Sequence, residues 1–468
     1  MELKELSRSK QEEGFLVWWR NTCLPDWRDT CLGLALSVAI GLALYHVAGV
    51  LPPFISHTDD FWFQADTEKV VQAMTLRESQ FHPMNRSRTH PLFPLLTYGP
   101  VYVLKHAFHI GPSDAVRIFY SGVASLWSLT LFALLKLLGC RRLDAAAFTL
   151  LASVSASSLF FFVVPETFGL GSLTILLAFL FVARTEISAT APGWYVVISI
   201  LAFSVTVTNW MFGVLAGFVT YPWKRVLQLS LYAFCLVVVL WGVQMLLIPD
   251  WTFFLPNFNN EAAYMLTPES GGALVVVRSF FFHSMVVPAI STLEHGMSYA
   301  WVNEQHVLLG PWLTTQASSP GSGSLWGRLA VCFWAVLMLI GCFGLLRLKQ
   351  HDRLRIMIGL TILGQLALHI LYGEETFLYS LHFLPLLIMV AAASTLTSAR
   401  PYALVLVGLL LATTAINNAQ LLQQASKLAQ GAYLRSQAQD AERSNSVDVD
   451  RAHWPSPLAV SPIIGLKR

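Results

Sequence analysis

The densest group of side chains that could do chemistry is the stretch HTDDFWFQAD at 57–66, which follows the first long apolar segment. It places Asp59 and Asp60 side by side, close to His57 and next to three aromatic residues. Carboxylates held against an apolar wall can act as a general base towards a hydroxyl group or bind a divalent cation. The alternative is that this Asp pair caps a short interfacial helix over 61–78.

A third acid, Glu166, occupies a very short turn between two long apolar segments. An acid in such a turn is unusual, and with Asp59 and Asp60 it completes a set of three candidate ligands for Mg²⁺ or Mn²⁺. The alternative is structural, because Pro165 and Glu166 favour the first turn of the following helix. The two roles are compatible.

Several basic and aromatic residues are candidate ligands for a phosphate group or a sugar. Arg86 and Arg88 stand close to His90 in the stretch NRSRTHPLFP. Arginine can donate two parallel hydrogen bonds to two oxygens of one phosphate group. Tyr379 and His382 are three residues apart, so they share one face of a helix. The alternatives are contact with lipid head groups for the arginines and an aromatic belt at the membrane interface for the later pair. The full set of candidates is His57, Arg86, Arg88, His90, Arg278, Tyr379 and His382.

The composition shows what kind of protein must position these residues. The chain has 468 residues, of which 55% are hydrophobic and only 12% are charged. Soluble proteins carry roughly 25% charged residues, so a soluble fold could not cover its surface with this sequence. A net charge of +3 without a basic stripe gives no support for nucleic-acid binding. The six cysteines show no paired spacing, which argues against a disulfide framework or a zinc site.

Apolar segments long enough to cross a bilayer recur along the chain, and only helices satisfy their backbone hydrogen bonds inside lipid at this length. We therefore expect an all-α polytopic membrane protein with about 9–11 transmembrane helices. The segment 193–222 is too long for one crossing and has Thr208-Asn209-Trp210 at its centre, which predicts a short helical hairpin. The other expected spans are 31–51, 118–135, 145–164, 167–183, 226–248, 329–346, 356–372, 376–397 and 401–418.

Lysine and arginine in the short loops predict the orientation, because such loops are usually cytoplasmic. The basic residues in question are Arg141, Arg142, Arg184, Lys224, Arg225, Arg347, Lys349, Arg353, Arg355 and Arg400. All of these basic loops fall on the cytoplasmic side only if the segment 91–108 lies against the outer face of the membrane and does not cross it. Pro94 and Pro100 interrupt that segment and Lys105 lies within it, which agrees with a non-spanning role.

This topology divides the chain into four parts. A cytoplasmic N-terminus is expected over 1–28, and a polar C-terminal tail over 419–468 is expected outside the cytoplasm. Between them we expect a catalytic transmembrane module over 29–225, with outer loops at 52–114 and 164–167, and a second transmembrane module over 226–418, with an outer loop at 249–327. The candidate catalytic and ligand-binding residues then all lie on the same side of the membrane.

The order, spacing and sidedness of these motifs resemble those of the GT-C superfamily of integral-membrane glycosyltransferases, which use polyprenyl-phosphate-linked sugars. Those enzymes carry an acidic motif directly after the first helix, matched here by Asp59-Asp60. Many have a juxtamembrane segment matched by His90-Pro91-Leu92-Phe93, and a second acidic position that corresponds to Glu166. The resemblance covers roughly 29–225, and the remainder is similar only in layout.

The resemblance implies a fold and a reaction. An enzyme of the bacterial inner membrane would transfer a sugar, with inversion, from a polyprenyl-phosphate donor to a glycan, lipid or protein acceptor at the periplasmic face. Asp59 or Asp60 would deprotonate the acceptor, and Glu166 would position the acceptor, assist the base or help hold a metal ion. Arg86, Arg88, Arg278 and His382 would bind the lipid phosphate. The sequence signatures of protein mannosyltransferases and oligosaccharyltransferases are missing, so the sugar and the acceptor stay open.

Two other functions compete with this interpretation. An O-antigen ligase or polymerase would also have a long outer loop with functional Arg and His residues, and 249–327 contains Arg278, His283, His295 and His306. A lipid or glycan transporter would carry charged or broken-helix elements near the middle of the membrane. The Asp59-Asp60 motif and the Glu166 turn favour the glycosyltransferase, because the expected spans have few charges and the acids lie outside them.

Overall fold

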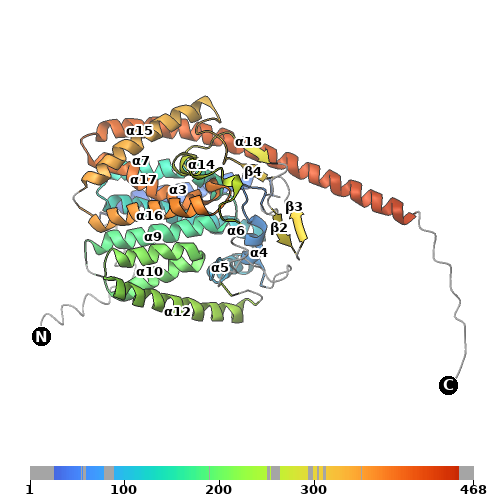
Figure 1. The fold of residues 1–468 in the computed structure, drawn as a ribbon, viewed down its shortest axis with the longest axis horizontal. Helices are drawn as coiled ribbons and strands as arrows, with labels where there is room; N and C mark the ends of the chain where they lie inside the picture. Colours follow the sequence, from blue (N-terminus) through green and yellow to red (C-terminus); the bar gives the residue numbers. More distant parts are fainter. Residues whose placement is uncertain are drawn as a thin grey trace, which may run out of the picture.

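The structure is a computed structural model. It describes residues 26–53, 55, 60–77, 89–188, 190–249, 253–254, 264–293, 299–302, 305–308, 312–348 and 350–452. The fold is a bundle of long helices that run side by side (Figure 1). Within the described residues, eight helices are long and apolar enough to cross a membrane, which confirms an all-α polytopic membrane protein at that level. They are α3 (Trp27–Val50), α6 (Pro112–Leu137), α9 (Thr167–Thr185), α12 (Trp223–Leu247), α15 (Leu325–Arg347), α16 (Asp352–Leu371), the unit Thr376–Leu396 that contains α17 (Ser380–Ala392), and α18 (Arg400–Ala452).

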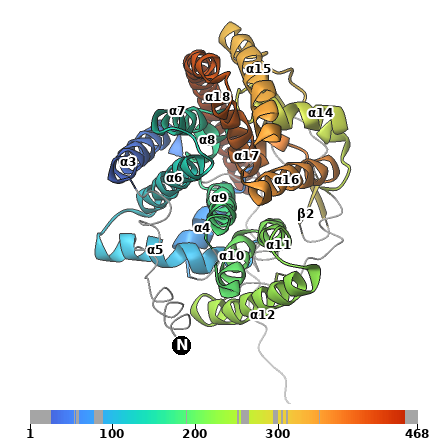
Figure 2. The same cartoon turned by 90° about the vertical axis from the view of Figure 1, so that its left-hand side faces the viewer.

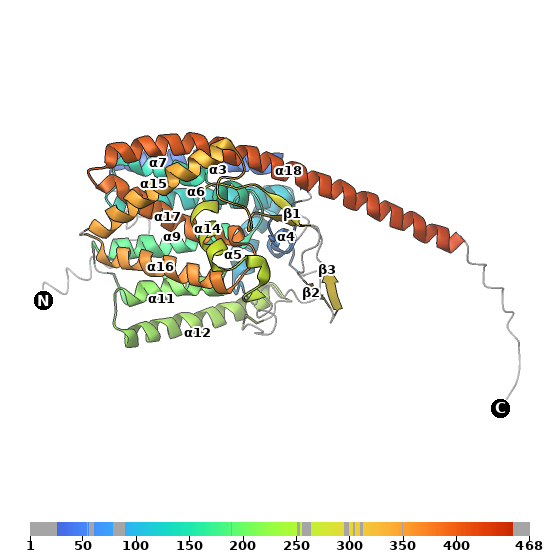
Figure 3. The same cartoon turned by 45° about the horizontal axis from the view of Figure 1, so that its top comes forward.

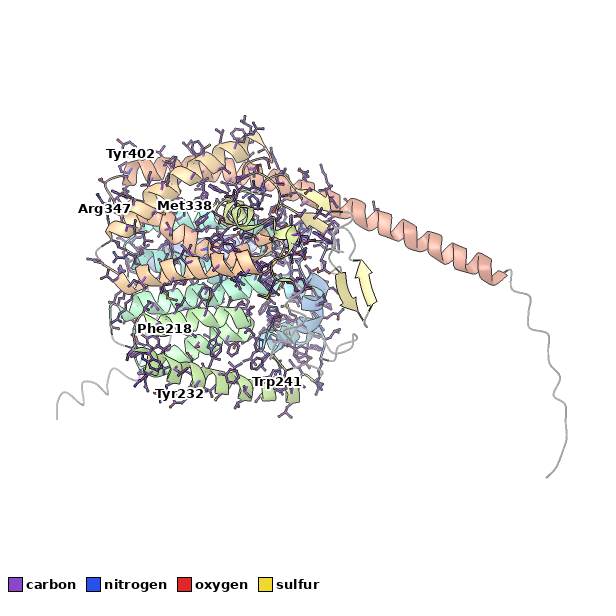
Figure 4. The ribbon with its side chains drawn as sticks, viewed as in Figure 1. Phe218, Tyr232, Trp241, Met338, Arg347 and Tyr402 are labelled. Atoms are coloured by element: carbon purple, nitrogen blue, oxygen red, sulfur yellow. The ribbon has the colours of Figure 1, made fainter. Side chains whose placement is uncertain are left out.

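Two of these helices form the centre of the bundle. In the most apolar part of the unit Thr376–Leu396, 94% of residues are buried, and the value for α9 is 83%, whereas α12 has only 22%. The end-on view shows α9 and α17 surrounded by the other helices (Figure 2). The peripheral helices expose large apolar and aromatic side chains such as Phe218, Tyr232 and Tyr402 (Figure 4), as expected for a surface that faces lipid.

The expected span over 145–164 is not one membrane-length helix in the described structure. It consists of α7 (Arg142–Ser153) and α8 (Ala156–Phe161), which are separated at Val154 and Ser155. The freed backbone groups find partners nearby, because Asn418 Nδ2 donates to the Val154 carbonyl at 3.0 Å and the Ala156 N–H donates to the Met285 carbonyl at 3.0 Å. Internal partners of this kind allow irregular backbone inside a membrane protein.

The segment 193–222 forms the helical hairpin that its sequence predicts. It contains α10 (Pro192–Val205), a 3-10 turn η3 (Val207–Asn209) and α11 (Trp210–Phe218). The two arms pack tightly, since the Trp210 ring stacks on Phe203 at 4.5 Å. Gly213 is required on the opposing face, because a Cβ atom there would lie 2.5 Å from Ser199 Cα.

One end of the bundle carries the long connections, and we call it the loop end. It holds α4 (Thr67–Thr75) and α5 (Phe93–Ala107), and α5 lies across the ends of the spanning helices (Figure 2). This arrangement agrees with the expectation that 91–108 does not cross. The same end holds η5 (Pro268–Ser270), α14 (Ala273–Arg278) and the π-helical turn η6 (Ser279–His283).

Short strands at the loop end were not expected from the sequence. β1 (Ser291–Leu293) pairs antiparallel with β4 (Trp312–Thr314), with Thr292 opposite Leu313. β2 (Tyr299–Val302) pairs antiparallel with β3 (Gln305–Leu308). Helix α18 continues past the bundle at this end (Figure 3), so the polar tail expected from 419 begins within one continuous helix. The opposite end, where Arg347 and Tyr402 lie (Figure 4), we call the basic end.

Candidate functional site

Aromatic side chains anchor Asp60 at the loop end. Phe61, Trp62 and Phe63 are all buried. Trp62 Nε1 donates a hydrogen bond to the Phe160 carbonyl at 2.9 Å, and the Phe63 ring packs edge-on against Phe377 at 5.2 Å. The aromatic residues beside the acidic motif therefore fix the backbone of Asp60 against the bundle, while its side chain stays only partly buried.

The chain around Asp60 adopts an unusual conformation. Asp60, Phe63 and Gln64 have positive φ angles of 66°, 53° and 65°. Each such non-glycine residue costs about 1–3 kcal/mol, and such strain is concentrated at functional sites. The turn is closed by hydrogen bonds from the Asp60 N–H to the Ala65 carbonyl and from the Gln64 N–H to the Asp60 carbonyl, both at 2.9 Å.

This turn corrects one expectation about the acidic motif. A helix over 61–78 capped by the Asp pair is not formed, because residues 61–64 are turns and α4 runs only over Thr67–Thr75. The buried aromatic residues and the positive φ angles exclude a helix at 61–64, and Asp66 occupies the N-cap position instead. Asp60 therefore does not cap α4.

Glu166 has the structural role that its position in the sequence suggested. It is buried at the N-cap of α9, where its Oε1 accepts hydrogen bonds from Thr167 N–H at 2.7 Å and from Thr167 Oγ1 at 3.0 Å. Its Oε2 accepts a hydrogen bond from the Asp66 N–H at 2.8 Å. Glu166 thus joins α9 to the start of α4, which fixes the Asp60 turn relative to the bundle.

Other acids lie near Asp60. Gln64 Nε2 donates a hydrogen bond to Oε2 of Glu374, which is 310 residues away in the sequence, at 2.7 Å. Lys69 Nζ forms an ion pair with Asp66 Oδ1 at 2.9 Å. Partial burial raises the pKa of the Tyr264 phenol, and the negative charges of Asp60, Asp66 and Glu374 raise it further. Segments far apart in the sequence therefore bring carboxylates together at the loop end.

The structure does not test the expected cation site completely. Within the described residues, no group of three or more His, Cys, Asp or Glu side chains could hold a metal ion. Asp59 lies outside those residues, so a site formed by Asp59, Asp60 and Glu166 stays a prediction. Both oxygens of Glu166 accept hydrogen bonds from backbone N–H groups. This arrangement is typical of a carboxylate that caps a helix and not of one that binds a cation.

A second group of polar residues is centred on His382. It includes His90 and His369, and we call these three residues the histidine cluster. His90 Nδ1 lies 2.6 Å from the Val205 carbonyl and 3.0 Å from Thr206 Oγ1, at the tip of the α10–α11 hairpin. The Tyr379 ring stacks on His369 at 4.9 Å.

Phe168, two residues after Glu166, packs against both candidates from the late apolar segment. Its ring centroid lies 5.2 Å from Tyr379 and 5.4 Å from His382. Tyr379 and His382 therefore share one face, as their spacing predicts.

Gly171 brings the hairpin and His382 together. A Cβ atom at Gly171 would lie 2.7 Å from His382 Nε2 and 3.0 Å from Asn209 Nδ2, so only glycine fits. Asn209 Nδ2 donates to the Gly171 carbonyl at 3.3 Å. In the described structure, His382 Nε2 and Asn209 Oδ1 are buried without a hydrogen-bond partner. Each such group costs about 1–3 kcal/mol, so this polar site is suited to binding a polar ligand.

The remaining candidates fall into two sets. Arg278, at the end of α14, donates from Nη2 to the Ala317 carbonyl at 3.1 Å, and α14 lies across the bundle from α4 and α5 (Figure 2). Helix α14 therefore lies apart from α4 and α5, but it packs against α16, the helix that carries His369. His57, Asp59, Arg86 and Arg88 lie outside the described residues.

The sequence analysis missed a polar stripe on α16. Thr361, Gln365 and His369 are four residues apart and all are buried. That spacing places them on one face of a helix and was visible within the apolar segment 356–372. Polar residues repeated every four positions inside a span were the signal that could have identified His369.

Comparisons with known proteins do not assign the chain to a family. No family model matches it, and no curated protein or solved structure matches it either.

Proposed function

We propose that the chain is a membrane glycosyltransferase that transfers a sugar from a polyprenyl-phosphate donor to a glycan, lipid or protein acceptor at the loop end. One observation carries the proposal. Buried aromatic residues hold Asp60 in a strained turn. A hydrogen bond from the Asp66 N–H to Glu166 joins this turn to α9. Helix α4, which follows the turn, packs against α5, and α5 lies across the end of the bundle. A carboxylate positioned this firmly beside a juxtamembrane helix is what a base acting on an acceptor at a membrane surface requires.

The proposed reaction is an inverting transfer. Asp60 or Asp59 takes the proton of the acceptor nucleophile, and the acceptor attacks the anomeric carbon of the sugar from the face opposite the phosphate. The bond between the anomeric carbon and the phosphate oxygen breaks, and the polyprenyl phosphate leaves with the electron pair. Glu166 positions the turn that carries the base, because both of its oxygens already accept hydrogen bonds.

The histidine cluster and Tyr379 contribute ligand binding in this proposal. Aromatic rings and neutral imidazole groups suit the apolar face and the hydroxyl groups of a sugar. His382 Nε2 offers one hydrogen-bonding atom without a protein partner. His90 connects this group to α5, since it stands three residues before the first residue of that helix.

Charge distribution supports a periplasmic location for the loop end. The short connections at the basic end carry Arg141, Arg225 and Arg353, whereas the loop end gathers carboxylates. Short loops rich in Lys and Arg remain in the cytoplasm. This supports a bacterial inner-membrane protein whose site faces the periplasm.

A transfer assay tests the proposal. The protein in lipid nanodiscs is given radiolabelled polyprenyl-phosphate sugars and a set of lipid and glycan acceptors, and product formation is measured. Asp60→Asn and Asp59→Asn are compared with Glu269→Gln, because Glu269 is an acid of η5 at the same end. We expect at least one of the first two variants to lose transfer and the control to keep it. Full transfer by both Asp59→Asn and Asp60→Asn would refute an Asp base.

The polar stripe on α16 favours transport as a second candidate. Gln365 is buried with neither amide atom bonded in the described structure, and polar side chains inside a span often line a translocation path. Proteoliposomes separate the two functions. A transporter would move a labelled lipid-linked glycan across the bilayer without forming a glycosidic bond, whereas the enzyme forms one.

A further inference from the structure

A pocket lies between the loop-end parts of α3 and α6. Its walls include Gly49, Leu51, Val116, Arg117, Tyr120 and Val164, and its cavity volume is about 90 Å³, partly open to the surroundings. Figure 2 shows α3 and α6 side by side at the edge of the bundle. Both helices are membrane-length, so the pocket lies where the membrane meets the loop end.

Two of three glycines spaced eight residues apart on α3 explain why the two helices approach closely away from the pocket. A Cβ atom at Gly33 would lie 2.9 Å from the Phe132 ring, and one at Gly41 would lie 2.8 Å from the Ser121 carbonyl oxygen. Small residues permit such close helix packing in membranes. Gly49, eight residues further along, instead faces the end of the Arg117 side chain, because a Cβ atom there would lie 3.1 Å from Arg117 Nη1.

The guanidinium group of Arg117 is positioned by neighbours that leave it able to bind an anion. It lies over the Tyr45 ring at 5.3 Å from the ring centroid. Its carboxylate partner within the described residues, Asp114, is half-exposed and stands 3.3 Å away on the same helix. An exposed pair of this kind contributes little, so a phosphate group can compete for the arginine.

The pocket adjoins the proposed catalytic region on two sides. Val163, Val164 and Pro165 form part of its wall and lead directly into Glu166. Ile55 also lines it, and the Ile55 carbonyl accepts a hydrogen bond from Thr67 Oγ1 at the start of α4.

We propose that this pocket binds the phosphate head group of an anionic lipid, with Arg117 as its phosphate ligand and the lipid chain along the apolar groove between α3 and α6. The combination of one arginine with an otherwise mainly apolar lining matches a phosphate attached to a hydrocarbon chain. The proposal rests on the proposed function, in which that lipid is the polyprenyl-phosphate part of the donor.

A binding measurement without any transfer step tests this site. Purified protein in nanodiscs of neutral lipid is titrated with polyprenyl phosphate, and the apparent Kd is compared with that for the uncharged polyprenol and for inorganic phosphate. We expect Arg117→Gln to weaken polyprenyl-phosphate binding about tenfold or more, which corresponds to the loss of one charge-assisted contact. The matched control is Arg328→Gln, because Arg328 is an exposed arginine near the loop-end start of α15. It should bind like the unaltered protein.

A second variant guards against misfolding of the first. Gly49→Leu presses only on the flexible end of Arg117, so the helices can stay packed while the guanidinium is displaced, and the same loss of binding is expected. Equal affinities of Arg117→Gln, Gly49→Leu and Arg328→Gln would overturn the site. Polyprenol binding as tightly as polyprenyl phosphate, or full displacement by millimolar inorganic phosphate, would also overturn it. Binding that depends on Arg117 in a protein without transfer activity would retain this site and count against the glycosyltransferase.

Discussion

The two ends of the bundle hold their acids in different ways. At the basic end, ion pairs connect helices that are distant in sequence. Asp29 on α3 pairs with Lys136 of α6 at 3.2 Å and with Arg142 of α7, while Asp144 of α7 accepts two hydrogen bonds from Arg400 of α18 at 2.7 and 2.8 Å. At the loop end, the ion pairs between described residues, Lys69–Asp66 and Arg117–Asp114, join residues only three apart.

The long-range hydrogen bonds that reach the loop-end carboxylates Glu166, Glu374 and Glu375 come instead from uncharged donors. Glu166 accepts from the Asp66 N–H, and Glu374 accepts from the Gln64 amide. Glu375 is buried and accepts from the Thr314 hydroxyl at 2.5 Å and the Thr315 N–H at 3.0 Å. The difference teaches that cations hold the basic end together, whereas hydrogen bonds and aromatic packing position the carboxylates at the loop end. We infer that the ion pairs at the basic end stabilise the fold, whereas the loop end carries the proposed reaction.

The largest effect should come from the proposed base. Asp60→Asn is expected to lower transfer by about 10²- to 10⁴-fold, the usual contribution of a general base. Because Asp66 and not Asp60 occupies the N-cap of α4, the melting temperature of Asp60→Asn in detergent should stay close to that of the unaltered protein. A comparable loss of transfer in Glu269→Gln would show that the effect is not specific to the base.

Breaking an ion pair at the basic end should damage the fold and not the chemistry. Asp144 is buried and Arg400 is its bidentate partner, so Asp144→Ala should destabilise the protein by about 3–5 kcal/mol. Thermal unfolding in detergent measures this. Asp352→Ala is the control, because Asp352 is an exposed acid at the same end whose ion-pair partner among the described residues, Arg355, lies on its own helix. Similar melting temperatures for both variants would contradict the structural role of the basic end.

Gly171→Ala tests whether the histidine cluster takes part in the proposed reaction. The new Cβ would press on His382 and Asn209, so we expect about 1–3 kcal/mol of destabilisation from overpacking. Transfer per folded molecule should also fall, because His382 must move. Gly408→Ala is the control, since that position on α18 has open space around it. If Gly171→Ala lost stability but kept full transfer per folded molecule, His382 would have no part in the reaction.

The smallest effect concerns Glu186, which follows α9 at the basic end. Burial alone would raise its pKa, but hydrogen bonds from His351 and from the Leu354 and Arg353 N–H groups outweigh burial and lower the pKa. A lowered pKa in the folded state stabilises the fold above the ordinary pKa of glutamate, and this stabilisation is lost as the pH falls through the folded value. Glu186→Gln should therefore show a weaker decline of melting temperature on acidification. An unchanged pH profile in the variant would exclude this contribution.

Local patterns in the sequence predicted much of the fold. Apolar length identified the spans, and the polar centre of 193–222 identified the hairpin, because a break inside a long apolar run must satisfy its own backbone groups. The two prolines and Lys105 in 91–108 identified the helix that lies across the bundle end. The break at Val154 was not visible, because its backbone partners, Met285 and Asn418, are far away in the sequence.

The candidate site was only partly predictable for the same reason. Asp60 and Glu166 stood out because acids are scarce near the spans, and the spacing of Tyr379 and His382 placed them on one face. No local pattern shows that Gln64 reaches Glu374, because that contact joins residues 310 positions apart. The placement of His369 beside Tyr379 depends likewise on how α16 packs against the unit Thr376–Leu396.

One paired measurement tests the division between the two ends most directly. Transfer per folded molecule and melting temperature are determined together for Asp60→Asn and Asp144→Ala in the same nanodiscs. We predict that Asp60→Asn loses transfer at an unchanged melting temperature, while Asp144→Ala loses melting temperature but keeps transfer per folded molecule. Full transfer by Asp60→Asn, together with a specific loss of transfer in folded Asp144→Ala, would contradict a loop end that carries the reaction and a basic end that stabilises the fold.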